Sequence, residues 1–332
     1  MIRHATGNEE ASHGDDGRYA RTDGRYRGDP DPPSDFIFYP RLEELRGDVH
    51  RTLELTRLHG TPMCMALGGV AGSGKSSFIY QIMTEHLPIE TDDLTRIPVV
   101  YVELPSPVTR RQAARAILWA LDDPGPHKNL DYDEINERII TLLRNCHVRL
   151  VILDDIHHIM KKRAVDWDLS EWLKTLIKKS QVPFLIIGIP KLVTRILEAN
   201  DQLSRLFQTR EELQPFPFNQ RDIASVVEFG QFIVFAEEAL GVRLTAQTDR
   251  ATLLAMLHQA TAGVVGNVVW LLRFAGYEAR ARGSDTIECC DLSRGFAKGL
   301  VGHLRAEGKN PRPNPFPQST QGTAGEGGNA NA

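Results

Sequence analysis

Residues 69–76 read Gly-Val-Ala-Gly-Ser-Gly-Lys-Ser and match the pattern G-x-x-x-x-G-K-[ST] in full. The apolar run 63–68 before them has the length of a strand, and residues 77–83 after them have the pattern of a helix opening. In this context the glycines let backbone N–H groups turn inward, and the helix N-terminus adds partial positive charge. The feature therefore predicts a loop that cradles the phosphates of a nucleotide.

The expected ligand of this loop is ATP with Mg²⁺. Lys75 would reach the β- and γ-phosphates, and Ser76 would place its hydroxyl on the metal ion. The residues predicted to contact the nucleotide in the loop are Gly69, Ala71, Gly72, Ser73, Gly74, Lys75, Ser76 and Ser77.

ATP hydrolysis also needs an acidic site that holds the metal and orients water. Residues 149–155 read Arg-Leu-Val-Ile-Leu-Asp-Asp, an apolar strand that ends in two carboxylates. We expect Asp154 to hold Mg²⁺ through water and Asp155 to polarise the attacking water. A strand ending in a turn with two solvated acids is the structural alternative.

The chain of 332 residues divides by composition into four segments. Residues 1–34 and 308–332 are rich in polar residues, Gly and Pro, so we expect disordered tails. Residues 35–216 alternate apolar strands with helices, which predicts an α/β core with a parallel sheet covered on both faces. Residues 217–307 show helical patterns with no strand between them, which predicts a small all-helical lid. A P-loop α/β core followed by such a lid resembles an AAA+ ATPase.

Three positions depart from the usual AAA+ pattern. Asp155 stands where Glu is usual, and its carboxylate is roughly 1.5 Å shorter in reach. A misplacement of that order costs about 10²-fold in rate, so we expect intact binding and slow hydrolysis. Ile189 follows the fourth strand where a polar sensor would sit. Asn267 stands where an arginine often points at the nucleotide, with Arg273 a weak substitute; Asn267 is interpreted equally as a nucleotide contact or as a helix N-cap.

An arginine from a neighbouring subunit often completes such sites by stabilising charge on the transferring phosphoryl group. The segment 201–210 after the fourth strand offers two candidates. We favour Arg205, acting in trans, over Arg210. An ordinary solvated arginine is the alternative for both.

Composition limits the other function classes. The net charge of −4 and the pI of about 6.3 exclude a chain that is basic throughout, so any contact with nucleic acid must come from a local patch. The first residues lack an apolar signal segment, and the longest apolar runs are far shorter than a membrane span. Four cysteines without metal spacing fit a reduced, cytoplasmic compartment.

With these residues placed, the chain resembles the TniB/TnsC family of AAA+ regulators of DNA transposition from about residue 36 to residue 300. The acidic strand followed by His157 and His158 is more specific than the P-loop, as is the later segment 202–207. The other similar segments are 36–41, 102–109, 188–190 and 263–267. Asp155, Ile189 and Leu206 depart from the family pattern, which commonly has Glu, Thr and a second Arg there. The adjacent histidines lack a visible third metal ligand, so we expect a packing or supporting role.

The resemblance implies a switch rather than a metabolic enzyme. Such proteins bind ATP, form rings or helical filaments on double-stranded DNA, and recruit a transposase. A target selector of the TniQ/TnsD type often loads them, and ATP hydrolysis disassembles the homo-oligomer. No membrane is involved.

DNA contact would need a local basic stripe, because phosphate neutralisation dominates such binding. Arg110 and Arg111 open a helix at the position that resembles the family's DNA-facing loop, and Thr109 could bind phosphate as well as cap that helix. A second basic loop follows the acidic strand at Lys161, Lys162 and Arg163. The lysines near residue 174 are better explained as solvated surface. Because no base-reading module is apparent, we expect binding that is independent of DNA sequence.

Two other functions stay open. The chain could be another AAA+ machine, such as an initiator-like, clamp-loader-like or protein-directed ATPase without a link to transposition. It could also be a P-loop kinase for a small molecule, although that would not explain the helical C-terminal subdomain.

Overall fold

The computed structural model describes residues 37–90, 95–106, 108–123, 131–161, 164–306, 308, 310 and 313–316. These residues form two compact units. The first comprises residues 45–68 and 78–212, and the second comprises residues 37–44, 69–77 and 213–316 as far as they are described. The phosphate-binding loop thus groups with the C-terminal helices. The predicted N-terminal tail lies outside the described residues.

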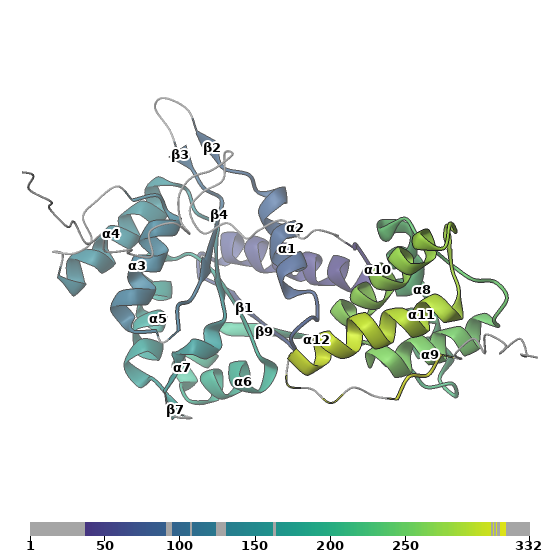
Figure 1. Ribbon diagram of the computed structural model, residues 1–332. Helices are drawn as coiled ribbons and strands as arrows, with labels where there is room; N and C mark the ends of the chain where they lie inside the picture. Colours follow the sequence, from purple (N-terminus) through teal and green to yellow (C-terminus); the bar gives the residue numbers. More distant parts are fainter. Residues whose placement is uncertain are drawn as a thin grey trace, which may run out of the picture. The chain divides into compact units, whose positions relative to one another are not determined.

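The first unit contains a five-stranded sheet, of which Figure 1 labels β1, β4 and β9. The strand order is β4-β5-β8-β1-β9. Its strands are β4 (Val99–Glu103), β5 (Leu150–Asp154), β8 (Phe184–Gly188), β1 (Cys64–Gly69) and β9 (Phe207–Leu213). The first four pair in parallel. β1, β5 and β8 are buried along their whole length, which explains their uninterrupted apolar sequences. The predicted parallel α/β core is confirmed.

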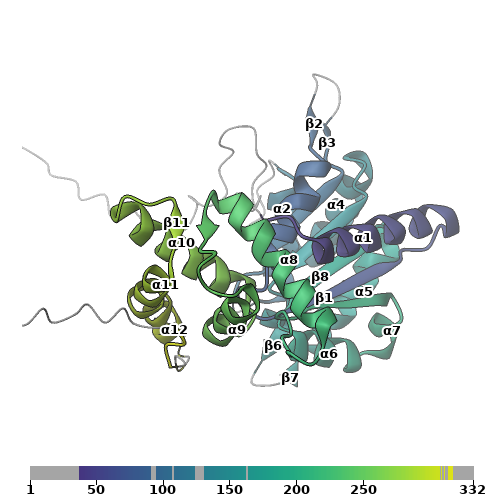
Figure 2. The same cartoon turned by 90° about the vertical axis from the view of Figure 1, so that its right-hand side faces the viewer.

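Helices cover both faces of this sheet. One face packs with α3 (Arg110–Ala120), α4 (Tyr132–Asn145), α5 (Trp167–Ser180) and α6 (Pro190–Glu198) in one apolar core. Figure 2 shows α1 (Pro40–His59) and α2 (Lys75–Glu85) on the other side of the sheet. The short helices are α7 (Asp201–Ser204) and the 3₁₀ turn η2 (Ile156–Ile159). Two antiparallel pairs join β2 (Ile89–Glu90) to β3 (Thr95–Arg96) and β6 (Met160–Lys161) to β7 (Ala164–Val165).

Side-chain caps fix where two of these helices begin. Thr109 caps α3 and accepts from the backbone N–H of Gln112, whose side chain accepts from the Thr109 N–H in return. Asp131 and Glu134 make the same capping box at the start of α4. The helix cap predicted at Thr109 is confirmed.

Strand β9 was not among the elements expected from the sequence, whose pattern over residues 202–207 indicates a short helix. The helix there ends at Ser204, and Phe207 begins the fifth strand. Residues 208–212 read Gln-Thr-Arg-Glu-Glu and are mostly exposed, so this edge strand lacks the apolar pattern that identifies the central strands.

The second unit is built from α8 (Ile223–Leu240), α9 (Arg250–Thr261), α10 (Val265–Ala281), α11 (Cys289–Gly295), the π-helix η3 (Phe296–Leu300) and α12 (Val301–Ala306). It is not all-helical as predicted, since β10 (Arg243–Leu244) pairs in parallel with β11 (Thr286–Ile287). Strands of two residues are too short to show an alternating apolar pattern in the sequence, so β10 and β11 could not be predicted. A buried ring cluster includes Tyr39, Phe216 and Phe232.

Part of the segment predicted as a disordered C-terminal tail packs against this unit. The Asn314 side chain donates to Ser293 Oγ at 2.9 Å, and the Phe316 ring is buried beside Phe296. Most of residues 308–332 lie outside the described residues.

Within the described residues, no single helix is long and apolar enough to cross a membrane; α9 and α10 reach that length and composition only as a pair bent by 112°.

Candidate functional site

The phosphate-binding loop follows β1 directly and leads into α2, which starts at Lys75. Gly72 and Gly74 have positive φ angles of 76° and 101°, conformations that glycine adopts without steric cost. The Lys75 ammonium donates to the carbonyl oxygens of Gly69 at 2.8 Å and Val70 at 2.9 Å. The structure therefore places the lysine charge over the loop that the sequence predicted to hold phosphate.

A cavity of about 290 Å³ lies at this loop, within the second unit. Its lining comes from the loop and the start of α2, from the segment before α1, and from the first turns of α10. These residues are Gly72, Gly74, Lys75, Ser76, Ser77, Ile37, Tyr39, Val265, Gly266, Val269, Trp270 and Arg273. The volume is close to the lower end of small-molecule sites, about 300–1,000 Å³.

The cavity combines polar groups for phosphate with an apolar side. Lys75 and Arg273 supply cationic groups, and Ser76 and Ser77 supply hydroxyls. Trp270 is partly exposed and stacks on Phe274 with 5.1 Å between ring centroids. Burial raises the pKa of the Tyr39 hydroxyl to about 12, so this group stays a neutral hydrogen-bond donor. The arrangement suits a ligand with an anionic end and a flat, apolar end.

The sequence predicted the cavity residues that come from the loop and the start of α2, but few of those that come from other segments. Five predicted loop residues line it, while Gly69, Ala71 and Ser73 complete the loop without lining it. Ile37, Tyr39 and Trp270 were not predicted as site residues. The segment 36–41 is rich in aromatic residues and similar to the family, and that signal could have identified Ile37 and Tyr39.

Asn267 is neither the N-cap residue of α10 nor a lining residue of the cavity. The N-cap of α10 is Val264, so the N-cap interpretation of Asn267 is wrong. The Asn267 side chain is buried and donates to the carbonyl of Thr261 at 3.1 Å, and it does not line the cavity. Arg273, the weaker candidate in the sequence, does line it.

Gly266 is the lid residue that touches the loop. Its N–H donates to the Gly72 carbonyl at 2.7 Å. A Cβ on Gly266 would lie 3.1 Å from Gly72 Cα and 3.2 Å from Gly72 O. A side chain at this position would be tighter than ordinary van der Waals contact, so glycine favours this close approach of α10 to the loop.

The substitution Gly266→Ala is therefore expected to displace the loop. Overpacking of this kind costs about 1–3 kcal/mol, and we expect a lower melting temperature and weaker ATP affinity together. Calorimetric titration with ATP and thermal unfolding would measure both. Gly302→Ala in α12 is the matched control, because no atom lies within 4 Å of the added Cβ. Equal ATP affinity in the two variants would contradict the close contact.

The acidic strand belongs to the first unit, where the ends of β1, β8 and β5 lie along one edge of the sheet. Gly68 pairs with Gly188, and Leu153 pairs with Ile186. Asp154 ends β5, is 9% exposed, and accepts from the Tyr101 hydroxyl at 3.3 Å. Burial, followed by the nearby Asp154 carboxylate, raises the pKa of Tyr101. The tyrosine thus stays protonated and fixes the orientation of the Asp154 carboxylate.

Asp155 lies just beyond the strand in a left-handed conformation with φ 53°. Its backbone N–H donates to Asp154 Oδ1 at 2.8 Å, and its own carboxylate is partly exposed at 3.7 Å from His157 Nδ1. His158 Nδ1 lies 2.8 Å from the Leu104 carbonyl oxygen. His158 thus links the turn after β5 to the residue that follows β4, and His157 lies beside the Asp155 carboxylate.

The fourth strand ends as the sequence indicated, without a polar side chain. Ile189 is partly exposed and serves as the N-cap residue of α6 without a side-chain hydrogen bond.

The two candidate trans-acting arginines differ in their surroundings. Arg210 lies in β9, and its guanidinium donates to Ser204 Oγ at 2.6 Å and to the Phe207 carbonyl at 2.9 Å. Arg205 follows α7 and is exposed, and no ion pair or side-chain hydrogen bond holds it within the described part of the chain. The surroundings favour Arg205 as the side chain available to another subunit.

The predicted DNA-binding residues are only partly described. Arg110 and Arg111 are exposed at the start of α3, and the Arg110 guanidinium lies 4.7 Å from the ring centroid of Tyr132. The Thr109 hydroxyl oxygen accepts the capping hydrogen bond. Lys161 ends β6, while Lys162 and Arg163 lie outside the described residues.

Comparison with solved structures shows which fold this is. Pyrobaculum aerophilum Cdc6p superimposes with a TM-score of 0.59 at 16% identity, over 81% of this chain and 70% of that one. The Aeropyrum pernix ORC2 protein gives 0.58 at 14% over 81% and 70%. The Aeropyrum pernix ORC1 protein gives 0.55 at 20% over 79% and 66%. A search of curated proteins found no match.

The sheet order, the phosphate-binding loop after β1 and the helical second unit define an AAA+ ATPase, a class of nucleotide-hydrolysing proteins. Residues 33–216 match the family model described as bacterial TniB protein. The chain belongs to the TniB family.

Proposed function

We propose that this protein is an ATP-dependent regulator of DNA transposition. It binds ATP and Mg²⁺, oligomerises on double-stranded DNA, links a target selector of the TniQ/TnsD type to a transposase, and disassembles on hydrolysis. The observation that carries the proposal is the TniB match over residues 33–216, which contains both the phosphate-binding loop and the acidic strand.

The cavity supports the nucleotide part of this proposal. Lys75 and Arg273 line it and offer positive charge to an anionic ligand, and the ORC2 neighbour is described as ADPNP–ADP complexes. Ser76 and Asp154 offer a hydroxyl and a carboxylate, the hard oxygen ligands that Mg²⁺ prefers. Bound Mg²⁺ would neutralise charge on the β- and γ-phosphates, while Asp154 holds the metal's water and Asp155 orients the attacking water.

Slow hydrolysis suits a switch that must persist on DNA until its partners arrive. Asp155 is shorter than the usual Glu, and Ile189 brings no polar sensor. Arg205, exposed at the end of α7, is proposed to act on the nucleotide of a neighbouring subunit.

Exposed basic residues at the start of α3 support contact with the DNA backbone. Arg110 and Arg111 lie side by side in sequence at an exposed helix start, and Thr109 opens the same turn. Lys161, Lys162 and Arg163 are proposed as a second basic loop. The ORC1 neighbour is described in complex with DNA, which shows that this fold can carry such a function. Contacts of this kind neutralise phosphate and would not read bases.

The test is size-resolved assembly by light scattering and negative-stain microscopy. The protein is compared alone, with an ATP analogue, with double-stranded DNA, and with both. We expect large assemblies only with both ligands, none with Lys75→Ala, and weaker DNA-dependent assembly with the pair Arg110→Ala and Arg111→Ala.

A different outcome would redirect the proposal. Assembly that is indifferent to DNA would favour a protein-directed AAA+ ATPase and leave Arg110 and Arg111 as solvated surface. Closed rings that bind DNA without recruiting a transposase would favour an initiator-like function.

A further inference from the structure

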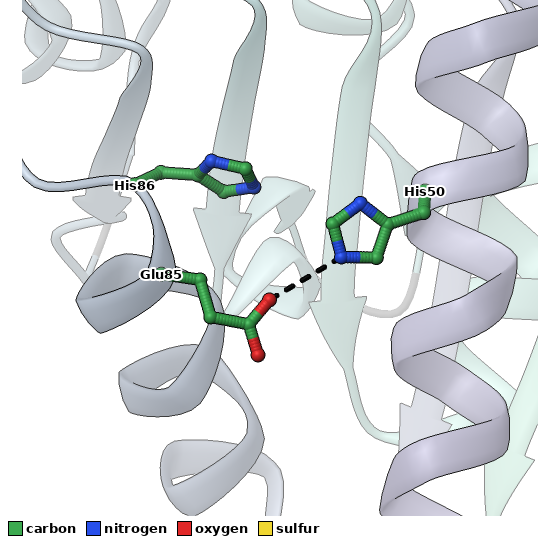
Figure 3. Close-up of side chains that lie close together, drawn as sticks. All are labelled: His50, Glu85 and His86. Carbon is green, nitrogen blue, oxygen red and sulfur yellow. Dashed lines mark hydrogen bonds and ion pairs between the residues drawn. The ribbon is translucent and has the colours of Figure 1, made fainter.

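Two histidines and a glutamate converge at the far end of α2 from the phosphate-binding loop. His50 projects from α1, Glu85 ends α2, and His86 follows it (Figure 3). One ligand atom from each residue lies within 4.8 Å of the other two. All three residues belong to the first unit. We propose that His50, Glu85 and His86 form a binding site for a divalent transition-metal ion of the zinc type.

The spacing is close to what such an ion needs. His50 Nε2 lies 3.3 Å from Glu85 Oε2. Two ligands at about 2.0–2.1 Å from a tetrahedral ion are roughly 3.4 Å apart, so this pair already has metal-ligand spacing. The rings of His50 and His86 are 5.8 Å apart between centroids. A small rotation of the His86 ring would bring its nitrogen to the same centre.

A ring nitrogen of His86 provides a second, independent observation in favour of a bound ion. His86 Nε2 is buried and has no hydrogen-bond partner among the described residues. A buried nitrogen without a partner loses hydration with no compensation, which is uncommon in native structures.

The surroundings hold the glutamate in a suitable orientation. Arg46 and Gln81 each donate to Glu85 Oε1 at 3.4 Å, which leaves Oε2 facing the histidines. Arg46 and Arg149 also bring positive charge, which weakens any cation site here. The two imidazole ligands favour an ion that binds nitrogen strongly, such as Zn²⁺, over Mg²⁺ or Ca²⁺, which need several oxygen ligands.

A fourth ligand position has room. Glu85 and His86 also line a cavity of about 690 Å³ at the amino-terminal edge of the sheet, next to Pro98 and Val182, which precede β4 and β8. Three protein ligands with an open side leave a position for water. Bound metal would fasten the end of α2 to α1.

Equilibrium dialysis of the full-length protein with Zn²⁺, in excess Mg²⁺ and without nucleotide, tests this inference. We expect one bound Zn²⁺ per chain and a higher melting temperature. His50→Gln and His86→Gln should each weaken binding more than about tenfold, because each removes a ligand and not merely an outer-shell contact. His59→Gln is the matched control, since His59 is exposed in the last turn of the same helix.

Binding of Co²⁺ in place of Zn²⁺ distinguishes this site from metal binding at the half-buried cysteines Cys289 and Cys290. Co²⁺ held by imidazole and carboxylate shows visible ligand-field bands without the sulfur charge-transfer band of a thiolate. A sulfur band, no bound Zn²⁺, or equal affinity in all three histidine variants would overturn the site. His50→Gln decides if His86→Gln fails to fold, because the His50 side chain is 44% exposed.

Discussion

Lys75→Ala is expected to lower ATP affinity by about 10²-fold while leaving the fold intact. Hydrogen bonds to charged groups contribute about 1.5–3 kcal/mol each, and the ammonium would donate such bonds to the β- and γ-phosphates. In the structure it donates to the carbonyl oxygens of Gly69 and Val70. The second of these bonds is exposed, so little stability depends on it. Titration with a fluorescent ATP analogue measures the affinity, and thermal unfolding measures the stability.

Lys75→Arg is the matched variant for this prediction. It keeps the positive charge, but the planar guanidinium is wider than an ammonium and does not fit the same loop. We therefore expect an affinity between those of the wild type and Lys75→Ala. If both variants bound ATP as tightly as the wild type, the cavity at residues 72–77 would not be the nucleotide site.

The central strands and the loop were predictable because their signals are local. The continuous apolar runs of β5 and β8 follow from burial on both faces, and the motif at residues 69–76 carries its own strand and helix context. Strand β9 was not predictable in this way. β9 lies at the edge of the sheet, and its central side chains are exposed and charged. They therefore show no apolar pattern in the sequence.

The rest of the candidate site depends on chain segments far apart in sequence. Residues 37–44 and 69–77 group with the C-terminal helices in one unit, so Tyr39, Lys75 and Trp270 line one cavity. No periodicity in the sequence indicates such a convergence. Similarly, the motif 263–267 drew attention to its polar residue, Asn267, whereas the close contact with the loop is made by the backbone of Gly266.

Asp155 is the residue whose substitution most directly tests the slow-hydrolysis hypothesis. The short reach of its carboxylate makes an aspartate unusual at this position. The structure gives a reason for it to be tolerated, since its φ of 53° lies in the left-handed region that Asp and Asn enter more readily than Glu. The turn is fixed by the bond from the Asp155 N–H to Asp154 Oδ1 at 2.8 Å. Reach and backbone conformation therefore favour different residues at this position.

Asp155→Asn and Asp155→Glu separate these two effects. Asn suits the same backbone conformation but lacks the charge that polarises water, so we expect unchanged ATP affinity and turnover at least about 10²-fold lower. Glu extends the carboxylate by roughly 1.5 Å, so we expect faster turnover, by up to about 10²-fold, together with a loss of stability of about 1 kcal/mol from the left-handed conformation. Steady-state phosphate release at saturating ATP and DNA, with thermal unfolding of each variant, measures both quantities. Full activity in Asp155→Asn would show that the Asp155 carboxylate takes no part in the reaction. An Asp155→Glu variant no faster than the wild type would show that the left-handed turn, rather than side-chain length, limits the rate.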